Sequence, residues 1–211
     1  MSSFTCEDCD EGMRRLKKDS IDLIFTDPPY VKEQYHNAYT ILANHAKRVL
    51  KPSGFLITYA PQYHLQDIMG ILGKKLGWYW LVCQINHGNN LLAVHYKNVI
   101  CGFKPILVYQ KPPFAPPEKI FLDRIEGRKA KDHHAWEQSI HEALHLLSRF
   151  PKKGEIILDP FAGSGTTLLA AKLLGLNYIG FERDQLTYEK AVKRLEQEPL
   201  DLRAFQEEQC P

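Results

Sequence analysis

The chain has 211 residues, of which 44% are hydrophobic and 25% are charged. That length fills one well-packed core and is marginal for two, so we expect a single domain over residues 1–211. The apolar runs are too short to cross a bilayer, and five sparse cysteines indicate reduced thiols rather than a disulfide framework. The polar, acidic first residues do not resemble a signal peptide, so we expect a cytoplasmic protein.

The charge is unevenly distributed, although the net charge is only +2. Residues 74–131 contain ten Lys and Arg but three Asp and Glu, which gives +7 and leaves −5 for the rest of the chain. A basic middle in an otherwise acidic protein fits a polyanionic partner such as nucleic acid. The alternative is a solvated, lysine-rich surface.

The first part of the chain predicts strands that alternate with helices. Residues 20–26 have the pattern of a buried strand, and the DPPY sequence at 27–30 must end it, because proline has no N–H for a central ladder. Helical spacing over 37–50, a strand over 54–60 and a helix over 62–76 follow. This order is typical of a parallel sheet covered by helices.

The middle of the chain has a different pattern. Residues 78–85, 91–100 and 103–111 predict three strands joined by Gly and Asn turns, in an antiparallel arrangement. Residues 111–119 and 124–134 are rich in proline and charge, which predicts extended or mobile segments.

The last part of the chain returns to the alternating pattern. We expect helices over 135–150, 166–175 and 185–198, strands over 154–159 and 177–182, and a glycine loop over 160–165. The tail, residues 199–211, is polar and is expected to be flexible.

The glycine loop is typical of a nucleotide-like cofactor site. Gly163 and Gly165 let the backbone approach a ligand, and Glu182, at the end of the next strand, can accept hydrogen bonds from ribose hydroxyls. No lysine stands where a phosphate loop needs one, and the glycine spacing departs from the dinucleotide fingerprint. A cofactor with a ribose and a carboxylate but no phosphates, such as S-adenosylmethionine, fits better than ATP, GTP or NAD. A glycine turn without a ligand is the alternative.

The two sequences DPPY and DPFAGSGTT together resemble the amino-methylating DNA methyltransferases, which modify N6 of adenine or N4 of cytosine. The catalytic motif comes first and the cofactor motif last, as in the circularly permuted beta class, and the likeness covers residues 6–197. It implies an α/β, Rossmann-like methyltransferase fold with a mostly parallel central sheet. It also implies a small inserted target-recognition region over 78–133, and a prokaryotic or phage origin.

The resemblance assigns the catalytic role to Asp27, Pro28, Pro29 and Tyr30. The Asp27 carboxylate and the Pro28 carbonyl would accept hydrogen bonds from the target amine, in a direction fixed by the prolines. Tyr30 would stack on a base flipped out of the duplex, and the methyl group would be transferred directly, in line. An Asp at the first position favours adenine N6, and cytosine N4 stays open.

The same resemblance implies a set of residues that bind S-adenosylmethionine, with Asp8 on its adenine and Glu182 on its ribose. The set is Asp8, Trp136, Gln138, Asp159, Phe161, Ala162, Gly163, Ser164, Gly165, Thr166 and Glu182. Ligands in open α/β sheets bind where the strand order reverses, so we expect the strands before Asp27 and before the glycine loop to be neighbours.

The basic middle is expected to contact double-stranded DNA. The phosphate candidates are Lys97, Lys104, Arg124, Arg128, Lys129 and Lys131, and the base-edge candidates are His87, Asn89 and Asn90. Asn and Gly are equally good turn formers. The region is short, so either the target site is short or a second subunit of a homodimer contributes. A partner restriction endonuclease is left open.

Two further patterns suggest metal ligands. HEALH at 141–145 matches a zinc-protease helix, but no third ligand follows soon after, and the helix needs its apolar stripe for the core. The pair in CEDC at 6–9 has no second pair, so we expect no metal. The alternatives to a DNA methyltransferase are an RNA or protein-glutamine methyltransferase, which resembles NPPY rather than DPPY, a zinc peptidase, and a catalytically silent DNA-binding module.

Overall fold

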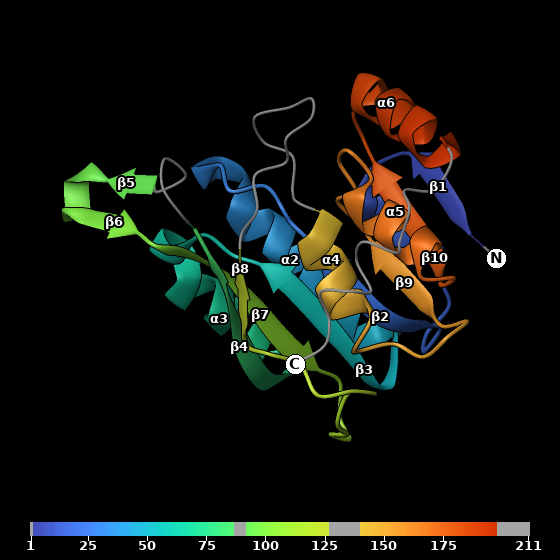
Figure 1. Cartoon of the computed structure of the whole chain (residues 1–211), viewed down its shortest axis with the longest axis horizontal. Coiled ribbons are helices and arrows are strands. Elements are labelled where there is room, and N and C mark those ends of the chain that lie inside the picture. Colours follow the sequence, from blue (N-terminus) through green and yellow to red (C-terminus); the bar gives the residue numbers. More distant parts are fainter. Residues whose placement is uncertain (1, 87–91, 127–139, 198–211) are drawn as a thin grey trace.

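The computed structural model describes residues 2–86, 92–126 and 140–197, which form one eight-stranded sheet with helices on both faces (Figure 1). In the order in which they lie side by side, its strands are β1 (Ser3–Cys6), β10 (Asn177–Glu182), β9 (Ile156–Asp159), β2 (Ile21–Thr26), β3 (Leu50–Tyr59), β7 (Phe103–Gln110), β4 (Gly77–Ile85) and β8 (Arg124–Glu126). The described helices are α1 (Cys9–Arg15), α2 (Lys32–Val49), α3 (Leu65–Gly73), α4 (Ile140–Leu147), α5 (Thr166–Leu173) and α6 (Gln185–Glu196).

The sheet is parallel from β1 through β3 and antiparallel where β7 pairs with β3 and β4. The edge strand β8 pairs with β4 in the parallel sense. The expected mostly parallel α/β architecture is therefore confirmed, and so is the antiparallel middle for β4 and β7.

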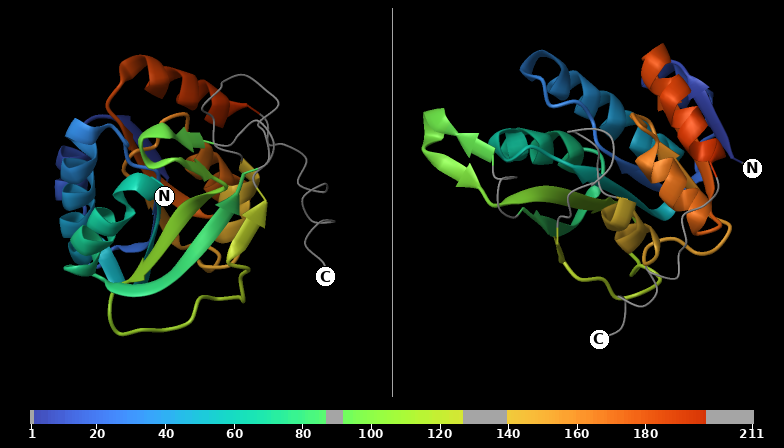
Figure 2. Two further views of the ribbon diagram at one scale, coloured as in Figure 1. Left: turned by 90° about the vertical axis from the view of Figure 1, so that its left-hand side faces the viewer. Right: turned by 45° about the horizontal axis from the view of Figure 1, so that its top comes forward.

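Helices cover both faces of the sheet (Figure 2). Two apolar layers hold them against it. On one face, α1, α2 and α3 bury Met13, Leu42 and Ile68 against the strands. On the other face, α4 and α5 bury Leu144 and Ala170. Because both faces are covered, the central strands are almost continuously apolar, as β2 is in the sequence.

Several boundaries differ from those predicted. The structure adds β1 and α1, which the sequence analysis did not predict, and α2 begins at residue 32 rather than 37. The KPSG sequence at 51–54 lies inside β3, and the predicted helix 62–76 begins as the 3-10 turn Gln62–His64 before α3. The start of the segment predicted to be extended or mobile, 124–134, forms β8, and its remainder lies outside the described residues.

The strand predicted over 91–100 is wrong. It is a small hairpin of β5 (Leu92–Val94) and β6 (Val99–Cys101), joined by the 3-10 turn His95–Lys97. Asn98 ends the turn in the left-handed region, at φ 51°, which asparagine tolerates better than most residues. The hairpin projects beyond the main sheet (Figure 1). None of the described helices has the length and apolar character that a bilayer crossing needs.

Candidate active site

The site begins where the strand order reverses, between β9 and β2. These strands are parallel neighbours, with Leu23 opposite Ile157 and Ile24 opposite Leu158. From β9 the chain continues outward to β10, whereas from β2 it continues the other way, to β3. The carboxyl ends of β9 and β2 therefore meet at one edge of the sheet, as the sequence analysis expected, and ligands bind at such an edge.

A buried hydrogen bond joins the two strand ends. The Thr26 hydroxyl donates to Asp159 Oδ1 at 2.7 Å, across 133 positions of sequence. The same oxygen accepts the Phe161 N–H at 3.1 Å, which fixes the start of the glycine loop. Burial raises the pKa of Asp159 to about 6. Thr26 immediately precedes Asp27, so the bond couples the position of the DPPY sequence to that of the loop.

The glycine loop is shaped by backbone geometry. Gly163 and Gly165 have φ values of +50° and +77°, which side-chain-bearing residues rarely adopt. The Gly163 N–H donates to Glu182 Oε2 at 2.9 Å, which ties the loop to the end of β10. A Cβ placed on Gly163 would meet only the Phe161 carbonyl oxygen, at 4.0 Å, so this position faces open space.

Two acidic side chains follow the neighbouring strands β10 and β1, and one of them, Glu182, contacts the loop. Glu182 pairs with Cys6 in the sheet, and its Oε1 accepts the Asp184 N–H at 2.8 Å. Asp8 follows β1, caps α1 by accepting the Asp10 N–H at 2.8 Å, and is exposed. Carboxylate oxygens can accept further hydrogen bonds, so both groups can receive hydroxyl or amino donors of a ligand.

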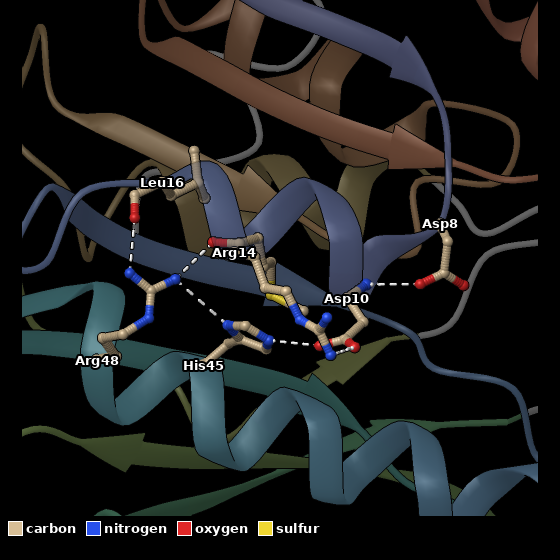
Figure 3. A network of polar contacts seen from close by, with 7 residues as sticks. Asp8, Asp10, Arg14, Leu16, His45 and Arg48 are labelled. Atoms are coloured by element: carbon tan, nitrogen blue, oxygen red, sulfur yellow. Dashed lines mark hydrogen bonds and ion pairs between the residues drawn. The ribbon is translucent and has the colours of Figure 1, made fainter.

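A polar network fixes helix α1, which begins after Asp8 (Figure 3). His45 Nε2 lies 2.7 Å from Asp10 Oδ1, and the Arg48 guanidinium donates to the Leu16 carbonyl at 2.6 Å and to the Met13 carbonyl at 2.5 Å. Since His45 and Arg48 belong to α2, the network anchors both ends of α1 to α2, and His45 holds the end that follows Asp8.

Arg194 of α6 is a functional candidate that the sequence analysis missed. Its guanidinium donates to the Thr166 hydroxyl at 3.0 Å and to the Ser164 carbonyl at 3.3 Å. These bonds brace the loop from a side chain 28 to 30 positions later in the sequence. Nothing in the local sequence around Arg194 distinguishes it from the other basic residues of α6.

On the other side of the switch point, Asp27 lies at the end of β2 with both carboxylate oxygens engaged. Oδ1 accepts the Tyr30 hydroxyl, and Oδ2 pairs with Lys104 Nζ at 2.9 Å. Pro28 is buried, which holds the backbone of this corner rigid. Burial raises the pKa of Tyr30, and the negative charge of Asp27 raises it further, so the phenol stays neutral.

Lys104 lies in the site rather than on the expected DNA-contacting surface. About a quarter of its side chain is exposed, and its ammonium lies 4.2 Å from the centroid of the Tyr59 ring and 5.2 Å from that of Tyr30. Its ammonium is bonded to Asp27, so Lys104 points into the site, and the phosphate contact predicted for it stays a prediction. The feature that could have predicted this placement is the position of Lys104 at the start of β7, the strand that pairs with β3.

Glu142 completes this cluster from α4. It is 2% exposed, and its Oε2 accepts the Tyr59 hydroxyl at 3.1 Å. Burial raises the pKa of Glu142 to about 7, while the Tyr59 hydrogen bond and the Lys104 charge oppose that rise. This is the glutamate of HEALH, and its described partner is a tyrosine. Within the described residues, no three His, Cys, Asp or Glu side chains gather as metal ligands.

The remaining DNA candidates are only partly described. Lys97 is exposed in the turn of the β5–β6 hairpin, and Arg124 on β8 pairs with Glu126 at 2.6 Å. The other predicted contacts lie outside the described residues: His87, Asn89, Asn90, Arg128, Lys129 and Lys131. The predicted cofactor residues Trp136 and Gln138 lie outside them too.

Comparison with known proteins agrees with this geometry. A sequence family described as DNA methylase, N6_N4_Mtase, matches residues 117–193. The Type II methyltransferase M.HpaI of Haemophilus parainfluenzae is 28% identical, over 92% of this chain and 74% of its own length. In sequence, the chain is therefore similar to the amino-methylating DNA methyltransferases.

Solved structures of such methyltransferases share the fold. The M1.HpyAVI–SAM complex superposes with a TM-score of 0.75 at 22% identity, and covers 93% of this chain and 100% of that one. The cytosine-N4-specific PvuII DNA methyltransferase gives a TM-score of 0.79 at 14% identity, with 98% and 90% covered. This chain therefore has the Rossmann-like fold of these proteins.

Proposed function

We propose that this methyltransferase uses S-adenosyl-L-methionine to methylate N6 of adenine in a short site of double-stranded DNA. The observation that carries the proposal is the Thr26–Asp159 hydrogen bond at the switch point. It links the acceptor Asp27 to the glycine loop, so the cofactor and the target amine would share one crevice although their motifs are far apart in the chain.

The residues present fit the cofactor. Gly163 faces open space beside Glu182, where a ligand can lie against the backbone without a side chain in the way. Glu182 would accept hydrogen bonds from the ribose hydroxyls and Asp8 one from the adenine amine. When bound, S-adenosylmethionine supplies a methyl group activated by a positively charged sulfur. The M1.HpyAVI–SAM complex supports this choice of cofactor.

Asp27 and the Pro28 carbonyl would prepare the target nitrogen. The lone pair of an exocyclic amine is conjugated into its ring, so the amine is a weak nucleophile. Two acceptors aimed at its hydrogens draw the nitrogen toward a tetrahedral geometry and release that lone pair. Asp27 and Pro28 lie on a corner stiffened by Pro28 and Pro29, which supplies orientation in advance.

The target base would have to leave the duplex to reach this corner. Flipping costs a few kcal/mol, and stacking on Tyr30 would offset part of it once the phenol turns away from Asp27. Residues 78–133 remain the proposed target-recognition region, with Lys97 on its exposed hairpin and Arg124 on β8 as proposed phosphate contacts.

Adenine is preferred because the motif begins with Asp. The alternative is N4 of cytosine, which the PvuII likeness keeps open. The Type II relative supports a restriction-modification setting, in which a partner endonuclease cuts the unmethylated site. A homodimer and a cytoplasmic location also remain proposals, and the first would explain how so short a recognition region reads a site.

The test presents the protein with labelled S-adenosylmethionine and, separately, duplex DNA, RNA and protein. We expect label in DNA, and N6-methyladenine after digestion to nucleosides. If N4-methylcytosine is found instead, the target is cytosine rather than adenine. Label found only in RNA or protein, or none in any substrate although the cofactor binds, would overturn the proposal.

A further inference from the structure

The acceptor carboxylate is occupied in the free protein. Asp27 must accept a hydrogen bond from the target amine in the proposed reaction, yet Tyr30 donates to one of its oxygens and the Lys104 ammonium to the other, at 2.9 Å. The ammonium is an N–H donor placed where an amine is expected. The target amine would therefore have to replace Lys104 or share the oxygen with it.

Sharing the oxygen is unfavourable for methyl transfer. The attacking nitrogen gains positive charge as it accepts a methyl group, and a lysine ammonium on the same carboxylate oxygen would repel that charge. Asp27 and Lys104 are each only about a quarter exposed, so water screens this repulsion weakly. Transfer is therefore faster if the ammonium leaves the oxygen first.

A second acidic group, Glu142, lies across the Tyr59 ring from the ammonium and is influenced by its charge. Lys104 Nζ lies 4.2 Å from the Tyr59 ring centroid, and the hydroxyl of that ring is bonded to Glu142 Oε2 at 3.1 Å. The aromatic face attracts a cation throughout such a movement. Glu142 is almost fully buried, and a buried carboxylate needs a cation nearby to remain ionised.

We propose, on the basis of the proposed function, that Lys104 is a positioning residue with two placements. In the free enzyme it holds the Asp27 carboxylate in place. When the target amine arrives, the ammonium moves over the Tyr59 ring toward Glu142, which leaves Asp27 Oδ2 to the amine. Glu142 and Tyr59 act through Lys104 and do not touch the base.

The proposal gives the reaction a pH dependence with a known sign. Among the described residues, the groups that act on Glu142 are Tyr59 from β3, Lys104 from β7 and Asp27 after β2. The pKa of Glu142 is raised to about 7. Below that pH Glu142 is neutral and Lys104 stays on Asp27. Above it the Glu142 carboxylate attracts the ammonium, so the transfer rate rises as pH increases through about 7.

A double-mutant cycle tests the coupling. Single-turnover rates at saturating cofactor and DNA, at pH 8, are compared for the parent, Glu142→Gln, Lys104→Met and the double variant. We expect Glu142→Gln to slow transfer about tenfold in the parent but by no more than about twofold in the Lys104→Met background. Cofactor affinity and unfolding temperature establish that each variant is folded.

Glu155→Gln provides a matched control. Glu155 is another carboxyl whose pKa burial raises, but its bond is to the Lys152 N–H, remote from Lys104. This variant should change the rate by no more than about twofold in either background, as distant sites do not couple. An equal slowing by Glu142→Gln with and without Lys104 would overturn the proposal, because it indicates a structural role.

Tyr59→Phe gives a second readout that does not depend on an active Lys104 variant. It keeps the ring under Lys104 and removes the hydrogen bond that lowers the pKa of Glu142. The midpoint of the pH–rate profile should therefore move upward. A midpoint that stays in place or falls would refute the two placements while the methyl transfer stands. If the parent transfers no methyl to DNA at any pH, the proposed function itself fails.

Discussion

The two sides of the switch point are built by different means. On the β9–β10–β1 side, backbone geometry shapes the site, through the left-handed Gly163 and the bond from its N–H to Glu182. On the β2–β3–β7 side, side-chain charge shapes it, through Asp27 and Lys104. The first arrangement suits a cofactor that is the same in every cycle. The second can rearrange when a base enters.

This difference predicts how each side fails. Substitutions on the backbone side should alter cofactor affinity by steric means, whereas those on the charged side should alter the rate and its pH dependence.

Asp27→Ala should reduce methyl transfer by about a thousandfold or more, because it removes the proposed acceptor of the hydrogen bond from the target amine. Cofactor affinity should change by no more than about twofold, since Asp27 lies on the target side. Calorimetry with S-adenosylmethionine and a single-turnover assay measure the two effects. Transfer at the parental rate would show that Asp27 is not the acceptor.

Gly163→Val should weaken cofactor binding at least about tenfold, because a branched side chain is strained at φ +50° and would project into the open space beside Glu182. Gly154→Val is the matched control, because Gly154 has φ +88° and open space around it but lies in the turn before β9. Equal losses of affinity in both variants would mean that general strain, not the cofactor loop, is responsible.

Arg194→Met should weaken cofactor binding by roughly threefold to tenfold, because the Ser164–Thr166 end of the loop loses its hydrogen bonds to α6. Lys193→Met, on an exposed position of the same helix, should leave the affinity unchanged. A dissociation constant for Arg194→Met within error of the parent would remove Arg194 from the site.

Asp159→Asn should change how stability depends on pH. The folded pKa of Asp159 is raised from 3.8 to about 6, so between these values the folded state holds a proton that the unfolded state has lost. The extra proton stabilises the folded state at low pH, and this stabilisation is lost as pH rises from about 4 to about 6. The loss in unfolding free energy is roughly 1.4 kcal/mol for each unit by which the pKa is raised.

Asparagine cannot titrate, so the stability of Asp159→Asn relative to the parent should rise between pH 4 and 6. Urea unfolding at several pH values measures the difference. Asp184→Asn is the control, because hydrogen bonds from Thr187 lower the pKa of Asp184 below 3.8. Its effect has the opposite sign and lies below about pH 4, so its stability relative to the parent should be flat between pH 4 and 6. A relative stability of Asp159→Asn that is flat across the window would contradict the raised pKa.

The alternation of strands and helices in the first and last parts of the chain could be predicted, because it follows from the local spacing of apolar residues, as in β2 and β9. That these two strands are neighbours could also be predicted, because ligand sites form where the strand order reverses. The edge strand β1 was missed because its four residues alternate between exposed and half-buried positions and form no apolar run. The hairpin was missed because Val94 and Val99 flank a turn that has the pattern of one strand.

The polar cluster at the target side could not be predicted. Lys104 and Glu142 come from β7 and α4, and only packing against Tyr59 of β3 brings them together. In the sequence, Lys104 is one of several lysines in a basic region, and Glu142 belongs to a pattern typical of zinc enzymes. Charge counting and motif matching compare residues that are close in sequence, whereas this site is formed by residues that are far apart in sequence and meet only in the folded protein.

The most direct test of the shared crevice is the position of the cofactor methyl group in the bound protein. Nuclear Overhauser contacts from 13C-methyl S-adenosylmethionine can be mapped onto assigned side chains. The account predicts contacts to protons of Pro28, Pro29 or Tyr30, together with contacts from the ribose to the Gly163 loop. Contacts of the methyl group only with side chains remote from residues 27–30 would contradict it.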